Sequence, residues 1–155
     1  MKKIAILFLL FFTFVNFLSA QDVILKKGRY IMRDNGKVYS GVFREYDANK
    51  KLSSATCIKN GLLEDSTILY YPTGVIKEIR SYREGKKHGI WTTWNEFGKK
   101  TAEAGFKDGK KDGHWYVWDD KGTKRYEMFY ENGEKKGEWI IRDEKGKVTS
   151  REEFK

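Results

Sequence analysis

The chain carries glycine and aromatic residues at a fixed spacing of 24 positions, for example from Gly89 to Gly113 (113 − 89). One complete copy of the pattern occupies residues 85–113. The glycine columns are Gly41, Gly89, Gly113 and Gly137, with Asp65 in the second place; Gly61, Gly85, Gly109 and Gly133; and Gly74, Gly98, Gly122 and Gly146, with Lys50 in the first place. A period of this length indicates a repeat architecture, in which each copy is one unit that stacks on its neighbours.

Three columns of mainly aromatic residues follow the same period. They are Phe43, Thr67, Trp91, Trp115 and Trp139; Tyr46, Tyr70, Trp94, Trp118 and Arg142; and Ile58, Tyr82, Phe106, Tyr130 and Phe154. In each copy a short strand rich in aromatic and β-branched residues, such as 90–94, leads into a polar turn that ends in glycine, such as 95–98. A second strand and a second turn complete the copy. Glycine supplies the positive φ that tight hairpin turns require.

This pattern predicts an all-β fold, an elongated single-layer antiparallel meander of about five 24-residue β-hairpin repeats. The repeats are placed at 41–64, 65–88, 89–112, 113–136 and 137–155. Residues 21–40 form an imperfect copy, which we expect to be N-terminal cap strands and a hairpin, because the end units of stacked arrays are atypical.

Turn positions predict how the aromatic side chains pack. Trp91 and Phe106 are equidistant from the bond between Gly98 and Lys99, so they are expected to face each other across one hairpin, and Phe106 is expected to face Trp115 of the next copy. One sheet face would then carry a nearly continuous aromatic ladder in which Thr67 is the gap. The column of Tyr46, Tyr70, Trp94 and Trp118 has the opposite parity and should point to the other face.

The first twenty residues resemble a secretory signal peptide, with Lys2 and Lys3, an apolar run from Ile4 to Leu18, and Ser19-Ala20 before the cleavage point. A membrane anchor is the alternative, but the run has 15 residues (18 − 4 + 1) and spanning a bilayer takes roughly 20. We therefore expect residues 1–20 to be removed and the protein to be exported to the periplasm or beyond the bacterial cell.

Composition excludes several classes of site. The formal charge of +9 falls to +7 (9 − 2) after cleavage, which favours acidic partners without naming one. A single cysteine, Cys57, cannot form an intramolecular disulfide, and one Cys with two His is too few for a metal cluster. With no nucleophile motif and no phosphate-binding loop, no catalytic, cofactor-binding or metal residues are expected, and the protein is not expected to be an enzyme.

Two sets of residues are candidates for binding. A single-layer sheet cannot bury both faces, so the first set is the aromatic column of Tyr46, Tyr70, Trp94 and Trp118. The second set is the lysine pairs at one series of turns, which could attract an anionic surface. They are Lys86 and Lys87, Lys110 and Lys111, and Lys135 and Lys136. Packing within the protein and plain solubility are the alternatives for the two sets.

Taken together, Gly89, Trp91, Trp94, Gly98 and the later Phe106, Gly109, Lys110 and Gly113, with their equivalents in neighbouring copies, resemble the bacterial variant of the MORN repeat, as found in YwqK-like antitoxins. The resemblance covers about residues 36–154. It implies a non-catalytic scaffold or binding module. Asp65, Thr67 and Arg142 depart from the pattern, which suggests a weaker second hairpin and a frayed last one.

The leading functional hypothesis is an exported repeat scaffold that mediates protein–protein interaction in the bacterial envelope. A carbohydrate- or lipid-binding module is the first alternative, with an anionic lipid or a cell-wall glycan as ligand. An antitoxin-like neutraliser of a partner toxin is the second. Nucleic acid is not expected as a partner, because an exported protein seldom meets it.

Overall fold

The computed structural model describes residues 22–155, so the signal peptide predicted at residues 1–20 lies outside the described residues. The described chain folds into β-strands joined by short turns. The strands are β1 (Val23–Lys26), β2 (Arg29–Met32), β3 (Gly41–Tyr46), β4 (Leu52–Lys59), β5 (Leu62–Tyr70), β6 (Ile76–Arg83), β7 (Lys86–Lys87), β8 (Gly89–Trp94), β9 (Lys100–Lys107), β10 (Lys110–Trp118), β11 (Lys124–Glu131), β12 (Glu134–Arg142) and β13 (Val148–Phe154).

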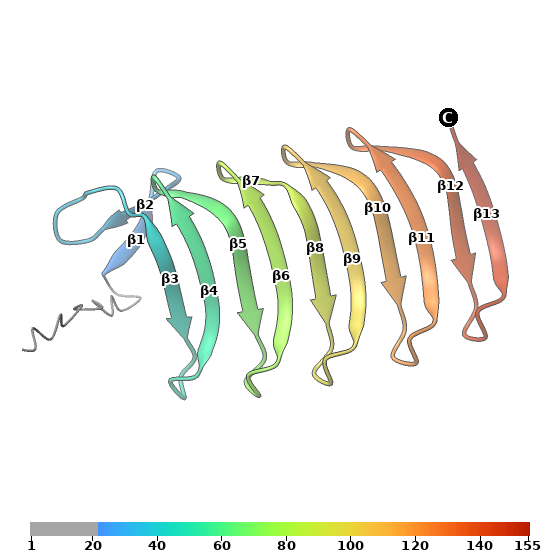
Figure 1. The fold of residues 1–155 in the computed structure, drawn as a ribbon, viewed down its shortest axis with the longest axis horizontal. Coiled ribbons are helices and arrows are strands. Elements are labelled where there is room, and N and C mark those ends of the chain that lie inside the picture. Colours follow the sequence, from blue (N-terminus) through green and yellow to red (C-terminus); the bar gives the residue numbers. More distant parts are fainter. Residues whose placement is uncertain (1–21) are drawn as a thin grey trace, which may run out of the picture.

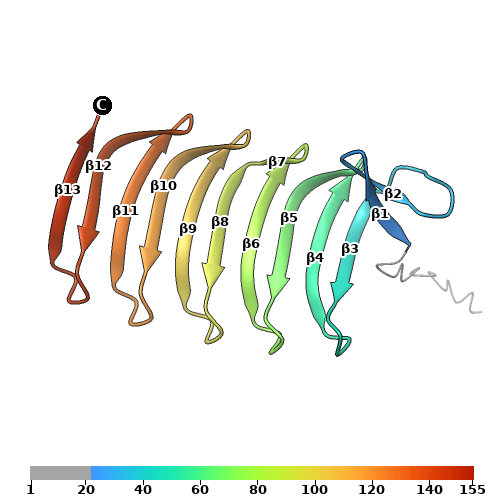
Figure 2. The same ribbon diagram turned by 180° about the vertical axis from the view of Figure 1, so that it is seen from behind.

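Strands β3 to β13 form one antiparallel sheet of 11 strands, while β1 and β2 form a separate two-stranded sheet. Neighbours in sequence pair throughout the long sheet except at β7, which pairs only with β6, so that β6 also pairs with β8. The views from both sides show the long sheet as a single row of hairpins, with the β1–β2 hairpin at its N-terminal end (Figures 1 and 2). This confirms the predicted all-β meander of hairpin repeats. None of the described residues belongs to a helix that could cross a membrane.

Four of the five turns along one edge of the sheet share an aspartate or asparagine that organises the backbone, and Tyr71 holds this position in the turn between β5 and β6. Asp119 is typical, because its Oδ1 atom accepts hydrogen bonds from the backbone N–H groups of Lys121 at 3.0 Å and Thr123 at 2.9 Å. Such side-chain bonds imitate a backbone turn and so stabilise the hairpin tip. Equivalent pairs of bonds are made by Asp47, Asn95 and Asp143.

The turns along the other edge connect one repeat to the next. Asp108 and Gly109 both have positive φ, 49° and 90°, as a tight hairpin turn of the mirror-image type requires. The N–H of Gly109 also donates to the carbonyl of Lys87 at 2.8 Å, so each turn is bonded to the turn before it. Lys50 and Asp65, which replace glycine in the repeat, keep the left-handed conformation with φ of 61° each.

The aromatic ladder is confirmed as a set of ring contacts, but its predicted register is wrong. Trp91 pairs with Ala104 across the hairpin, and Gly89 pairs with Phe106. Trp91 and Phe106 therefore meet diagonally, with 4.9 Å between ring centres. The turn is centred at Phe97 and not after Gly98, because the N–H of Asn95 donates to the carbonyl of Lys99. A bulge beside Trp94 then moves the pairing by one residue back toward the predicted register.

The diagonal contacts continue from Tyr82 to Phe154 with 4.9–5.5 Å between successive ring centres. Aromatic pairs at this separation each contribute about 0.5–1.5 kcal/mol beyond the area that they bury. We call this side of the sheet the ladder face. Its three tryptophans are also hydrogen-bonded: the indole N–H of Trp115, for example, donates to the carbonyl of Gly105 at 3.0 Å. The ladder therefore takes the place of a second layer.

The N-terminal hairpin closes one end of the ladder. Val23, Tyr39 and Ile58 form a small buried cluster, against which Tyr30 and Phe43 pack. The rings of Tyr30 and Phe43 lie 5.9 Å apart. Residues from this segment thus pack against the first repeat. The suggested weak second hairpin is not seen in the pairing, since β5 and β6 pair from Asp65 to Tyr70, while the strand is interrupted later, between β7 and β8.

Candidate functional site

The face opposite the ladder, which we call the opposite face, carries the four aromatic residues proposed as a binding column. Strand alternation places Trp94 on this face because Trp91, three residues earlier, lies on the ladder face. Each of the four pairs with a residue six positions later, next to a bulge: Tyr46 with Leu52, Tyr70 with Ile76, Trp94 with Lys100, and Trp118 with Lys124. The column is therefore one regular row near the hairpin tips.

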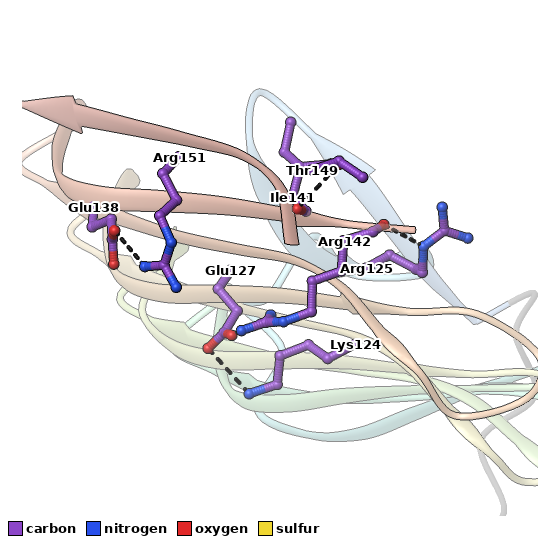
Figure 3. Close-up of polar contacts among 8 residues, drawn as sticks. All are labelled: Lys124, Arg125, Glu127, Glu138, Ile141, Arg142, Thr149 and Arg151. Atoms are coloured by element: carbon purple, nitrogen blue, oxygen red, sulfur yellow. Dashed lines mark hydrogen bonds and ion pairs between the residues drawn. The ribbon is translucent and has the colours of Figure 1, made fainter. Parts of the chain in front are cut away.

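The C-terminal half of the opposite face, on β9–β13, is a network of ion pairs. Lys100 Nζ lies 2.8 Å from Glu103, and Lys124 Nζ lies 3.2 Å from Glu127. Arg142 forms an ion pair with the same Glu127 (Figure 3). Further along, Arg151 bonds to Glu138 at 2.5 Å. Each of these charged side chains therefore has an oppositely charged partner on the same face.

Glu127 is the centre of that network, and the cations around it lower the pKa of its carboxyl group. Burial acts to raise the pKa of this carboxyl group, but hydrogen bonds from Arg142 and Lys124 outweigh burial, and the pKa is lowered. The guanidinium of Arg125 also donates to the carbonyl of Arg142 at 2.7 Å (Figure 3). The side chains therefore bind β11 and β12 together.

Trp118 and Tyr116 belong to this charged half. Lys100 Nζ lies 5.5 Å from the Trp118 ring centre, and Lys124 Nζ lies 4.3 Å from the Tyr116 ring centre. The two rings are 5.7 Å apart. Trp118 is thus packed against its neighbours in the sheet, which is the alternative that the sequence left open for this column.

The N-terminal half of the opposite face, on β3–β8, is apolar where the C-terminal half is charged. The positions held by Lys100 and Glu103 in the third repeat are Ile76 and Ile79 in the second. Several apolar side chains here are exposed: Val42 by 40%, Tyr46 by 51%, Ile76 by 37% and Ile90 by 49%. We call this surface the aliphatic patch; its residues are Val42, Tyr46, Leu52, Ala55, Ile68, Tyr70, Ile76, Ile79, Ile90 and Trp94.

Sequence reasoning placed Tyr46, Tyr70 and Trp94 in a binding column but missed the aliphatic residues around them. The signal was present in the repeat, because the column 52, 76, 100, 124 changes from Leu52 and Ile76 to lysine. The column 55, 79, 103, 127 changes from Ala55 and Ile79 to glutamate. Only comparison of equivalent positions between copies reveals the change, since single aliphatic residues in a strand are ordinary.

The lysine pairs do not form one regular stripe. Lys87, Lys111 and Lys135 are 24 residues apart and lie over the ladder rings. Lys111 Nζ, for instance, is 4.4 Å from the Trp115 ring centre and 4.6 Å from that of Tyr130. We call Lys87, Lys111 and Lys135 the ladder lysines. The other lysine of each pair precedes the ladder lysine at Lys86 and Lys110 but follows it at Lys136. The last pair is shifted by one position relative to the other two, so one lysine of each pair lies over the rings.

Within residues 22–155, no three His, Cys, Asp or Glu side chains lie close enough together to hold a metal ion. Cys57 is a free, half-buried thiol whose Sγ lies 4.0 Å from Ser66 Oγ. His88 Nδ1 is 3.2 Å from Asp108 at the sheet edge, where it belongs to the junction between repeats.

A scan against protein-family models matches residues 111–134 to the MORN repeat variant. No curated protein matches the chain. Among solved structures, a chain from the "Crystal structure of accessory secretory protein 1,2 and 3 in Streptococcus pneumoniae" is similar, with a TM-score of 0.38 and 14% sequence identity. The match covers 78% of this chain and 22% of that chain. The protein therefore contains a MORN repeat variant at residues 111–134, set within an antiparallel meander of hairpins.

Proposed function

We propose that this protein is an exported, non-catalytic binding module that contacts a partner protein through the opposite face of its sheet, within the bacterial envelope. The observation that carries the proposal is a row of aromatic side chains, one per repeat from Tyr46 to Trp118, on a face that no second layer covers in the described chain (Figures 1 and 2). The predicted signal peptide supports export.

A sheet face of this kind suits a protein partner for physical reasons. Tyrosine and tryptophan contribute a large rigid contact area at low entropic cost, and they are enriched among the residues that dominate interfaces. The ladder on the other face already stabilises the hairpins. The opposite face can therefore vary in chemistry from repeat to repeat without loss of the fold, as β3–β8 and β9–β13 show.

Site-specific photo-cross-linking in cells that express the protein naturally tests this function. A photoreactive amino acid at Trp94 should cross-link one partner protein in a defined stoichiometry. The matched control is the same amino acid at Tyr126, which is an exposed aromatic residue of β11 on the ladder face. Equal cross-linking from both positions, or no protein cross-linked at Trp94, would exclude the opposite face as a protein-binding surface.

The resemblance to YwqK-like antitoxins supports a second candidate, in which the partner is a toxin. An exported antitoxin requires a toxin that is exported as well, because a toxin in the cytoplasm would be out of reach. Co-expression of the protein with the product of each adjacent gene tests this, with the signal peptide kept or deleted. Growth rescue that needs the signal peptide supports the antitoxin function, and the absence of any toxic neighbour rejects it.

A further inference from the structure

We propose that the partner docks on the aliphatic patch of β3–β8, and that it is a protein segment with apolar side chains bordered by carboxylates. This inference rests on the proposed function and narrows it to one half of the opposite face. It also excludes Trp118 and the ion-pair network of β9–β13 from direct contact.

The repeats themselves show that the fold does not require the aliphatic residues. Lys124 and Glu127 occupy the same two positions in the fourth repeat as Ile76 and Ile79 in the second, and both repeats form the same hairpin with the same bulge. Exposure of an isoleucine side chain to water is unfavourable, because apolar surface has a lower free energy when it is buried. A contiguous apolar surface that the fold itself could replace with ion pairs is typical of an interaction site.

The border of the patch is positively charged. By strand alternation Arg44, Lys59 and Arg83 lie on the opposite face around the aliphatic patch, and none of them forms an ion pair within the described residues. The carboxylate of Glu64, which accepts the backbone N–H of Glu84 at 2.7 Å, also lies on this face, and the three cations outnumber it. Unpaired cations around an apolar centre complement a partner with carboxylates at the corresponding border.

The same geometry argues against a flat lipid surface. The aliphatic patch and the ion pairs of Glu103 and Glu127 lie on one continuous sheet face. A planar membrane pressed on the patch would also remove water from those carboxylates, and desolvation of charged groups is costly. A protein segment can cover β3–β8 alone. A segment of that size fits a surface that changes from apolar to charged between β8 and β9.

The test replaces Ile76 with Lys and Ile79 with Glu in one variant. This I76K/I79E double variant gives the second repeat the charges that the third and fourth repeats carry, so it should fold with unchanged far-UV circular dichroism and a similar unfolding midpoint. The matched control is K100E/E103K, which reverses one ion pair outside the patch. Both variants keep the net charge of the chain.

The probe is a phage-displayed library of random 12-residue peptides, selected on the full chain. Selected peptides should combine aliphatic or aromatic residues with Asp or Glu. As synthetic peptides, they should bind I76K/I79E at least about tenfold more weakly than wild type, as loss of a central apolar contact implies. Binding to K100E/E103K should change less than about threefold. An R44Q/R83Q variant should weaken binding at low salt and flatten its salt dependence.

Other results overturn the inference. Peptides that bind I76K/I79E as tightly as wild type, basic selected sequences, or no selected sequence at all would each reject it. Vesicles of phosphatidylcholine and phosphatidylglycerol that bind wild type but not I76K/I79E would identify a lipid, and a dimer lost in I76K/I79E would identify a second copy of the chain. If a partner cross-linked at Trp94 still binds I76K/I79E, the proposed function stands and this docking site does not.

Discussion

The guanidinium of Arg80 lies over the indole ring of Trp91, with 5.3 Å between the central guanidinium carbon and the ring centre. Arg80 pairs across β5 and β6 with Thr67, the residue that interrupts the aromatic ladder. Its Nη2 atom bonds to Glu78 at 2.7 Å, which holds the guanidinium in place. The guanidinium thus reaches the ring on β8, on the side of β6 away from Thr67, and it adds a cation to the aromatic ladder.

Replacement of Arg80 with Ala should therefore destabilise the protein. A cation–π contact contributes about 0.5–2 kcal/mol, and the apolar stem of arginine also packs against its neighbours. We expect a loss of about 1–3 kcal/mol, measured as a lower urea midpoint by tryptophan fluorescence. The control is Arg83→Ala on the same strand, which should change stability by less than about 0.5 kcal/mol. Equal losses in both variants would show that the ring contact has no special role.

The ladder lysines should matter for stability more than their neighbours. Lys111 lies over two rings, whereas the adjacent Lys110 is exposed and contacts no ring. Lys111→Gln should reduce the free energy of unfolding by about 0.5–2 kcal/mol. Lys110→Gln, which removes the same charge one residue earlier, should have an effect below about 0.5 kcal/mol. If the two variants lose the same stability in urea, the positive charge and not the ring contact is responsible.

Replacement of Asp65 with glycine should stabilise the folded protein. Its φ of 61° lies in the left-handed region, where a side chain costs about 1–2 kcal/mol and where the other repeats place Gly89, Gly113 and Gly137. Part of the gain is offset by the greater freedom of glycine in the unfolded chain, so Asp65→Gly should stabilise by about 0.5–1 kcal/mol.

The next residue, Ser66, provides the control for Asp65→Gly. Ser66 lies in the same strand without a positive φ, so Ser66→Gly should destabilise by about 0.5–1 kcal/mol. Thermal unfolding followed by circular dichroism measures both variants. A fall in the melting temperature of Asp65→Gly would mean that the Asp65 side chain makes a stabilising contact that outweighs its backbone strain.

Glu127 should make stability depend on acid pH. Its pKa in the folded protein lies below the ordinary value of 4.5, because Arg142 and Lys124 donate to the ionised form and outweigh the effect of burial. The resulting stabilisation is fully present above about pH 4.5 and is lost as the pH falls through the lower folded pKa. Urea midpoints between pH 7 and pH 3 should therefore fall less steeply in Glu127→Gln than in wild type.

Glu131→Gln is the control for that measurement, since Glu131 ends the same strand, is exposed, and takes part in no ion pair within residues 22–155. Its pH profile should follow wild type. A Glu127→Gln profile as steep as wild type would show that the acid sensitivity arises elsewhere in the sheet.

Much of the fold could be predicted because it depends on local periodicity. The period of 24, the turn glycines and the parity of Trp91 against Trp94 are properties of short segments, and each requires only strand alternation and turn chemistry. The register could not be predicted as well. The expected pairing of Trp91 with Phe106 assumed a turn centred after Gly98, whereas the turn is centred at Phe97 and a bulge moves the pairing by one residue. Nothing local in the sequence distinguishes a bulged hairpin from a regular one.

The sequence by itself determined that this protein is a row of β-hairpins, which residues form one aromatic face, and which aromatic column lies opposite. The tertiary structure decided how the remaining long side chains are used. It placed Lys87, Lys111 and Lys135 over the rings, brought Arg80 over the ring of Trp91, and divided the opposite face into a charged half and an aliphatic half. The physical reason is the length of these side chains. The charged group of lysine or arginine lies several ångströms from its own backbone, so its contacts depend on which strands are neighbours in space.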